Sequence, residues 1–403
     1  MNFPEIQTRL GPTNVKSVEQ SALLEQPADG GWGDESHGRQ QRSGPAGAFA
    51  RLVMLNQASS NAVKDFLRPA AQQAGGAAEQ QVSAEQDGAS SAEAFLRSVA
   101  LRCDSNKQVQ RKFDAVVDSA AAVRQQSHLA EASLREYAVL GFVDTPDAPD
   151  AGPWRGETLA QLRKLEAPAP LTPEVLNQPN SSADFFEQLL AMIGQIRGEY
   201  LAVYEELLRK YSDFYKEFNE EVMAKMQDWI KGSTDGKSVD LNVGVLTAIN
   251  RLIAKYSAQP TGVLFPIPDK DGNLPPATEA DAKKWAEAMG MGKDSPNVKP
   301  DGKGGFVVMM DLSALNTMQA NLIPLFQREE GMPPWPSARL DSAKFNAWKS
   351  GFDNQESELK NQLQMFTTKY SNANSYHENF NKILSSQLSM YSEMLTQMAR
   401  AIA

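Results

Sequence analysis

Two long stretches of this sequence carry apolar side chains at alternating intervals of four and three residues. The second stretch, residues 342–400, contains no proline, because the last proline of the chain is Pro336. One uninterrupted helix can therefore form over the whole stretch, with a single apolar stripe along it. The core positions predicted on this stripe are Leu359, Leu363, Phe366, Phe380 and Leu384.

The first stretch, residues 181–231, predicts another long helix. Ser181 or Ser182 can cap its beginning, and Gly232 follows its last residue. Beyond Leu207 the spacing becomes looser and nearer to 3.6 residues, which predicts weaker supercoiling there. The core positions predicted on this helix are Leu189, Ile193, Ile196, Val203 and Leu207.

The two stripes are expected to pair with each other. An apolar stripe of this length must face another helix or remain in water, and burying each large side chain contributes ~1.5–3 kcal/mol. The stripes have comparable lengths and end at the same intervening segment, which favours an antiparallel coiled coil within one molecule. A parallel homodimer is the competing solution.

Residues 232–340, between the two helices, predict a small mixed α/β module. Residues 239–243 alternate like a half-buried strand, and residues 306–310 form a short apolar strand candidate. Helical spacing occurs around residues 244–257 and 279–290. The chain thus leaves one long helix, builds this module and returns along the other.

The part of the chain before residue 181 divides into three predicted segments. Residues 1–47 are rich in glycine and polar residues and are expected to be disordered. Residues 48–140 contain two helical stretches, 48–68 and 92–140, and predict a helical hairpin. Residues 141–180 are rich in proline and predict a linker at a domain boundary.

The predicted fold class is therefore mainly α. A long antiparallel intramolecular coiled coil carries an N-terminal helical hairpin and a small inserted α/β module. The predicted divisions of the chain are 1–47, 48–140, 141–180, 181–231, 232–340 and 341–403.

Charge and composition exclude several classes of function. A formal charge of −10 argues against a dedicated nucleic-acid binder and against adsorption to anionic lipid. No apolar run is long enough to span a bilayer, and the N-terminus lacks a cleavable secretory signal. Cys103 is the only cysteine, so no intramolecular disulfide can form, and we expect a core side chain there.

No motif in the sequence demands catalysis or a cofactor. His377 falls on the apolar stripe, where we expect a core imidazole, and neither other histidine lies near it in sequence. No combination of serine or cysteine with histidine suggests a nucleophile. The chain is predicted to be neither an enzyme nor a metal protein.

The segment Lys369–Ser375 is the most informative part of the second helix. Ala373 on the stripe permits close helix approach, and Asn372 and Asn374 flank it with amide groups. One interpretation is a polar layer that fixes the helix register. The other is a docking surface on the outer face for another helical subunit, and the residues alone do not decide between them.

Several motifs closely resemble the IpaD/SipD/BipD family of type III secretion needle-tip proteins. The resemblance covers about residues 181–403, with the motifs in order and suitably spaced. Its C-terminal part rests on residues 344–352, 359–364, 369–375 and 382–386. Its upstream part rests on residues 200–204, 211–215, 235–243 and 304–308.

This resemblance implies secretion under an uncleaved N-terminal signal and assembly at the needle tip on the bacterial surface. It implies a monomer in solution, a roughly pentameric cap, and a hairpin that acts as an internal chaperone. The implied partners are the needle subunit, the hydrophobic translocators and, in some members, bile salts. The positions expected to bind the needle subunit are Lys369, Tyr370, Asn372, Asn374, Ser375 and Lys382.

Two other functions remain as alternatives. One is a secreted effector whose activity lies in the 232–340 module, which a deep pocket with convergent titratable groups would favour. The other is a pore-forming translocator, and the missing hydrophobic hairpin argues against it.

Overall fold

The fold is described from a computed structural model of the chain. The structure describes residues 44–68, 88–139, 151–168, 170–171, 177–233, 237–269, 271–292, 294–328 and 332–402. Most of the segment predicted as a disordered N-terminus with a secretion signal lies outside these residues, as does the first part of the predicted 141–180 linker.

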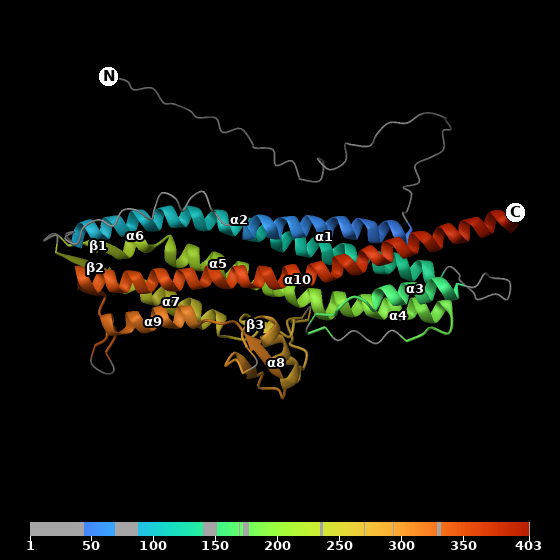
Figure 1. Cartoon of the computed structure of the whole chain (residues 1–403). Helices are drawn as coiled ribbons and strands as arrows, with labels where there is room; N and C mark the ends of the chain where they lie inside the picture. The colour runs from blue at the N-terminus through green and yellow to red at the C-terminus, as the bar shows by residue number, and fades with distance from the viewer. Residues whose placement is uncertain are drawn as a thin grey trace, which may run out of the picture. The chain divides into compact units, whose positions relative to one another are not determined.

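Helices α1 (Pro45–Leu67) and α2 (Gly88–Val139) lie side by side (Figure 1). Pro45 stands in the first turn of α1, where its fixed φ suits the helix and its missing N–H costs nothing. The helix ends at Leu67. Arg68 is extended because it precedes Pro69, and a residue before proline disfavours the helical conformation. Apolar side chains from both helices face the interior, among them Phe49, Phe95 and Phe113.

The first predicted coiled-coil helix is a chain of helical segments interrupted by two π-helical turns. Its N-cap is Ser181, whose hydroxyl accepts a hydrogen bond from the Asp184 N–H at 3.1 Å. Each π-turn accommodates an extra residue and rotates the following apolar stripe. The segments are α4 (Ser182–Gln195), η2 (Ile196–Leu201), α5 (Ala202–Phe218), η3 (Asn219–Met223) and α6 (Met226–Trp229).

Helix α10 (Ser342–Ile402) is the longest element, with 61 residues. It packs on α5 and η2 on one side and on α1 on another, so it has more than one buried face (Figure 1). All of the predicted seam residues on both helices are 2% exposed or less. The predicted fold class, mainly α with a small α/β module, is confirmed.

Helix α3 (Gly152–Leu162) lies within the segment that was predicted as a linker. Pro153 stands in its first turn, where proline is compatible with a helix, and Trp154, Leu159 and Leu162 are buried. The helix contacts α10, so this part of the Pro-rich segment is packed structure. The prolines limit the helix to a short element without preventing it.

The inserted module begins with a sheet that joins the ends of the long helices. Strand β1 (Ile230–Gly232) follows α6 directly, and β6 (Ser337–Asp341) leads directly into α10. Between them lies β2 (Ser238–Asn242), antiparallel to both, with Val239 opposite Gly232 and Leu340. The sheet therefore fixes where the antiparallel helices start and stop.

The second part of the module is a three-stranded antiparallel sheet with order β3-β5-β4. Lys210 of α5 is buried and its ammonium donates to the carbonyls of Pro260 and Val263, which ties this part to the coiled coil. The elements are β3 (Val263–Phe265), β4 (Val298–Pro300), β5 (Phe306–Met309), α7 (Gly244–Tyr256), α8 (Glu279–Ala288) and α9 (Ser313–Phe326).

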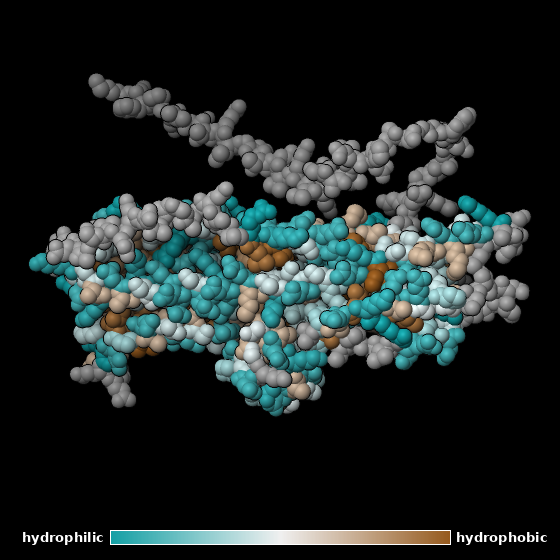
Figure 2. All heavy atoms as spheres, viewed as in Figure 1, coloured by the Kyte–Doolittle hydropathy of each residue, from teal (hydrophilic) through white to brown (hydrophobic). Residues whose placement is uncertain are grey.

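Hydrophilic residues cover most of the face seen in Figure 2, and hydrophobic residues form only small patches on it. Among the helices of the described residues, none is both long and apolar enough to cross a membrane. In the same residues, no group of His, Cys, Asp or Glu side chains could hold a metal ion.

Candidate docking surface on α10

The residues predicted to bind the needle subunit divide into covered and accessible positions. Tyr370 and Asn374 are buried, at 1% and 0% exposure, beneath α1. Lys369 is half-buried, and the remaining positions are exposed. The accessible positions are Asn372, Ser375 and Lys382. Lys382 forms an ion pair with Glu378 at 2.7 Å.

Asn374 belongs to a buried polar layer between α10 and α1. The Asn56 side-chain amide donates to Asn374 Oδ1 at 2.7 Å, and Asn374 Nδ2 donates to the Asn56 carbonyl at 2.9 Å. Asn381 Nδ2 donates to Asn56 Oδ1 at 3.1 Å. Each of these amide side chains is buried and cannot hydrogen-bond to solvent. The hydrogen bonds between the two helices take the place of those to water.

His377 completes this layer. Asn56 Nδ2 lies 3.2 Å from His377 Nδ1, and the ring is 2% exposed. Burial lowers the pKa of His377 to about 3, so the ring is neutral and its Nδ1 accepts the hydrogen bond from Asn56. The imidazole expected in the core is therefore part of a polar contact between two helices.

A second polar contact lies one helical turn away. The Tyr370 hydroxyl lies 2.8 Å from Ser59 Oγ, which in turn lies 2.9 Å from Ser119 Oγ of α2. Burial raises the pKa of Tyr370, so the phenol stays protonated and can share in this chain of hydroxyls. Three helices are thus joined by hydroxyl groups at one level.

The exposed side of the same helix pair forms a shallow polar groove of 450 Å³. Ser375, one of the predicted positions, lies in it opposite Asn61 and Lys64 of α1. The groove lies directly beside the buried layer, because Ser60 both lines it and accepts from Asn374 Nδ2 at 3.0 Å. Its other lining residues are Gln57, Ser371 and Glu378.

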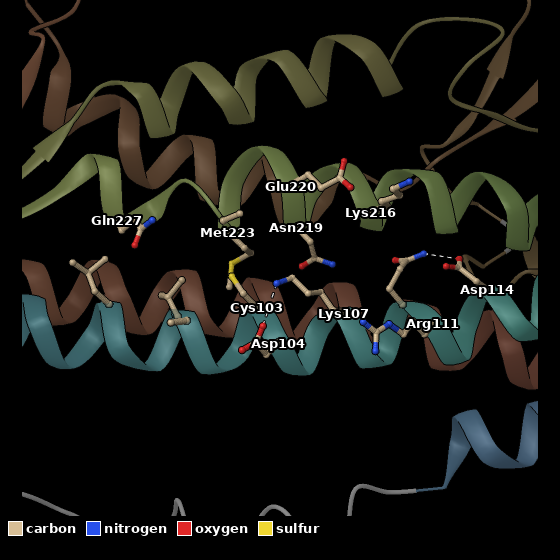
Figure 3. A pocket seen from close by; sticks show the side chains of 15 residues that line it. Cys103, Asp104, Lys107, Arg111, Asp114, Lys216, Asn219, Glu220, Met223 and Gln227 are labelled. Carbon is tan, nitrogen blue, oxygen red and sulfur yellow. Dashed lines mark hydrogen bonds and ion pairs between the residues drawn. The ribbon is translucent and has the colours of Figure 1, made fainter. Parts of the chain in front are cut away.

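A larger cavity of 510 Å³ lies between α2 and the helix formed by α5 and η3 (Figure 3). Gln227 lies toward one end of it and Arg111 and Asp114 lie toward the other, with Cys103 and Met223 between them. Cys103, predicted as a core side chain, is half-buried and lines this cavity instead. Burial is the main cause that raises the pKa of its thiol.

The π-turn η3 supplies one wall of this cavity. Asn219, the first residue of η3, accepts a hydrogen bond at 2.9 Å from the buried Asn106 of α2. No spacing rule in the sequence indicated this contact, because a π-turn changes which side chains face a neighbouring helix. The sequence analysis did not predict this cavity.

The profile of the family described as type III secretion systems tip complex components matches residues 39–397. The chain belongs to this family. The resemblance expected from the sequence motifs is therefore confirmed, and the matched range includes the hairpin, the coiled coil and the module.

Relatives of this tip-complex component include two proteins named for invasion. It is 37% identical over 211 residues to the cell invasion protein SipD of Salmonella typhi, an alignment that covers 52% of this chain and 58% of SipD. It is 32% identical over 217 residues to the invasin IpaD of Shigella flexneri, covering 53% and 59%. The alignments thus span less than two thirds of either relative.

A solved structure supports the fold of this tip-complex component. The pathogenicity island 1 effector protein from Chromobacterium violaceum is 26% identical to the chain and superposes with a TM-score of 0.56. The superposition covers 86% of this chain and 99% of that protein. The prediction that the chain is not an enzyme stays a prediction.

Proposed function

We propose that this chain caps the needle of a type III secretion apparatus, where it controls secretion and recruits the hydrophobic translocators. It leaves the cell by that apparatus, exists as a monomer in solution, and forms a roughly pentameric cap at the needle tip on the bacterial surface. Family membership supports the role in type III secretion. The finer steps rest on the surfaces described above.

The observation that carries the proposal is the polar layer under α1. Asn374, His377 and Asn381 are buried where α1 covers α10, and each of them forms a hydrogen bond with Asn56 of α1. If the hairpin of residues 48–140 swings away, these groups become free to bind another helix, such as one of a needle subunit. The hairpin therefore works as an internal chaperone that blocks this face before secretion.

The cavity beside α2 fits an amphipathic anion such as a bile salt. Its apolar end, with Leu96, Val99 and Met223, suits a fused-ring body, and Arg111 supplies a positive charge for an acidic group. A ligand here contacts the hairpin and the coiled coil together. A bile salt at a free concentration of ten times its dissociation constant would raise the unfolding free energy of the chain by ~1.4 kcal/mol.

The end of α9 offers a surface for the translocators. Ile323, Met332 and Trp335 are exposed large hydrophobic residues, between 44% and 50% accessible, in the module. The Arg328 guanidinium lies 4.0 Å from the centre of the Trp335 ring and holds it in place. Exposed aromatic and aliphatic groups of this kind are typical of protein-binding surfaces.

No observation favours the alternative function, a secreted effector with activity in the 232–340 module, over the proposed one. The family profile matches this module together with the helices on either side of it.

The test is an NMR titration of the isotopically labelled needle subunit with the full chain and with a variant that lacks residues 1–140. We expect the shortened chain to bind the needle subunit at least about tenfold more tightly. In the full chain only the fraction of molecules whose hairpin is open can bind, and this lowers the apparent affinity. Within the shortened chain, Asn374→Ala and Asn372→Ala should both weaken binding.

An unchanged monomer with unchanged affinity for the needle subunit after the deletion would contradict the proposal. A separate titration of the isotopically labelled full chain with deoxycholate tests the cavity, with Arg111→Gln expected to weaken binding of the bile salt and Lys382→Gln expected to leave it unchanged.

A further inference from the structure

The polar layer between α1 and α10 has a fixed hydrogen-bond direction. Asn374 Nδ2 donates to the Asn56 carbonyl at 2.9 Å and to Ser60 Oγ at 3.0 Å, so its Oδ1 must accept. Asn56 Nδ2 donates to this Oδ1 at 2.7 Å and to His377 Nδ1 at 3.2 Å. Asn381 Nδ2 donates to Asn56 Oδ1 at 3.1 Å. The layer therefore holds His377 as an acceptor.

Rotation of the Asn56 amide cannot accommodate an additional proton on His377. A protonated imidazole has two N–H donors and no acceptor. Turning the amide over would bring its oxygen toward the ring but also against Asn374 Oδ1, and its amino group against that of Asn381. Asn374 cannot turn over in response, because its own amino group donates to a backbone carbonyl. Protonation of His377 therefore breaks hydrogen bonds of the layer.

His377 has no carboxylate that would stabilise a positive ring. It is 2% exposed and burial is the only cause of its lowered pKa, so no charged group of the described residues acts on it from α1, α2, η2 or α10. Burial also raises the pKa of the phenols Tyr370, Tyr376 and Tyr200, which stay neutral. Charged side chains of these helices pair with one another or line the outer groove, among them Lys64 and the pairs Glu378–Lys382, Arg197–Glu131 and Arg124–Glu205.

The other histidine of the described residues lies on a second contact of the hairpin. His128 Nε2 of α2 lies 2.7 Å from Arg197 Nη1 of η2. A guanidinium can only donate, so this nitrogen accepts, and a protonated ring would face a positive group instead. Burial, Arg197 and Arg124 lower the pKa of His128, and Glu131 raises it. His128 is exposed, so solvent screens this contact and it is the weaker of the two.

Release of α1 is the smallest opening that gives His377 access to water. The hydrogen-bond partner of the ring belongs to α1, whereas α10 also packs on α5 and η2. Helix α1 has 23 residues, and its buried residues include the polar Asn56 and Ser59. Its separation therefore exposes less apolar surface than unfolding of the coiled coil. A proton taken up by the ring favours this local opening before the rest of the chain unfolds.

We propose that acid opens the hairpin, because protonation of His377, with a smaller contribution from His128, releases α1 from α10. The pKa of His377 is about 3 in the closed form and ~6.5 once the ring reaches water. Between these values the open form binds the additional proton, so the closed form loses stability as pH falls below ~6.5. The open fraction should be about 25-fold larger at pH 5 than at pH 7.

This inference deepens the proposed function, because it names a condition that removes the cover from α10. The test is hydrogen exchange of the full chain at pH 7 and pH 5, followed by mass spectrometry. The results are expressed as protection factors, which remove the pH dependence of the intrinsic exchange rate. Protection factors of α1 should fall about 25-fold from pH 7 to pH 5 and should lie below those of α5 at both pH values.

His377→Gln is the first variant, because its amide oxygen can accept from Asn56 at either pH. The fall in α1 protection should shrink to less than about fivefold in this variant. His128→Gln is the matched control and should retain most of the fall. Asn56→Asp carries the opposite expectation: its carboxylate stabilises the protonated ring, so α1 protection should not fall toward pH 5.

Circular dichroism verifies that each variant is folded, and either His377→Gln or Asn56→Asp suffices if the other does not fold. Three results would overturn the proposal: equal α1 protection in the native chain at both pH values, an equal fall in the native chain and His377→Gln, or α1 protection as high as that of α5. No needle subunit is used, so its failure to bind the shortened chain would leave this result intact.

Discussion

Asn372 and Asn374 are two residues apart on α10 but have opposite surroundings. Asn374 is fully buried and bonds to Asn56 and Ser60, whereas Asn372 is exposed. We predict that Asn374→Ala lowers the unfolding free energy by ~1–3 kcal/mol, because the buried Asn56 side-chain amide and backbone carbonyl each lose a hydrogen-bond partner. Urea denaturation followed by circular dichroism measures this loss.

Asn372→Ala is the matched control and should change the unfolding free energy by less than ~0.5 kcal/mol. Equal effects of the two substitutions would mean that α1 does not cover Asn374 in solution.

His377 predicts how stability depends on pH. Burial lowers its pKa to about 3 in the folded chain, whereas an unfolded chain has its ordinary value of ~6.5. Between these values the unfolded state binds the additional proton, so stability is lost as pH falls below ~6.5. At pH 5 this group alone lowers the unfolding free energy by ~2 kcal/mol relative to pH 7.

The measurement is urea denaturation at both pH values for the native chain, His377→Gln and His128→Gln. The pH-dependent loss should shrink by ~2 kcal/mol in His377→Gln and by less in His128→Gln, since His128 is exposed and its pKa is lowered less than that of His377. A full pH-dependent loss in His377→Gln would show that the ring is not buried in solution.

Sequence analysis predicted the buried apolar residues but not the buried asparagines. The stripe predicted which apolar residues are buried, because burial of leucine or phenylalanine follows helix periodicity. It could not separate Asn374 from Asn372, since the face of α10 toward α1 is polar in sequence. Asn56 carried no signal either, because its partners lie more than 300 residues away.

At the scale of elements, Lys210 connects the inserted module to α5. Its buried ammonium donates to two backbone carbonyls of the segment that contains β3, and burial lowers its pKa. We predict that Lys210→Met lowers the unfolding free energy by ~1–3 kcal/mol, because both carbonyls lose their donor. Hydrogen exchange should be faster in residues 258–265 of this variant.

Lys216 lies on the same helix and is exposed, so Lys216→Met is the matched control with unchanged exchange in residues 258–265. Faster exchange in both variants would point to loss of charge rather than loss of the two carbonyl contacts.

Elements with a strong period were predictable, and short elements between prolines were not. The predicted stripes of 181–231 and 342–400 are buried, although two π-turns interrupt the first helix and α10 also buries a second face against α1. Several prolines surround helix α3, and α9 contains Pro324 in its interior, so the sequence around both argued against a helix. Their stability comes from packing on the long helices, which no local pattern records.

At the scale of the whole molecule, residues 43–403 form one compact unit. Within it, α10 contacts the hairpin, the coiled-coil partner, α3 and the module. Polar layers hold α1 on α10, and α3 closes one end of the seam. The account requires that the hairpin of α1 and α2 can leave α10 while the remaining helices stay packed.

The most direct measurement uses pyrene labels on the two sides of the polar groove. In a Cys103→Ser background, cysteines replace Asn61 of α1 and Ser371 of α10, which line the same groove and are not among the positions predicted to bind the needle subunit. The free chain should show strong excimer emission, because the two labels lie side by side. The account predicts that this emission is lost as the needle subunit binds. Excimer emission that persists in the bound complex would contradict it.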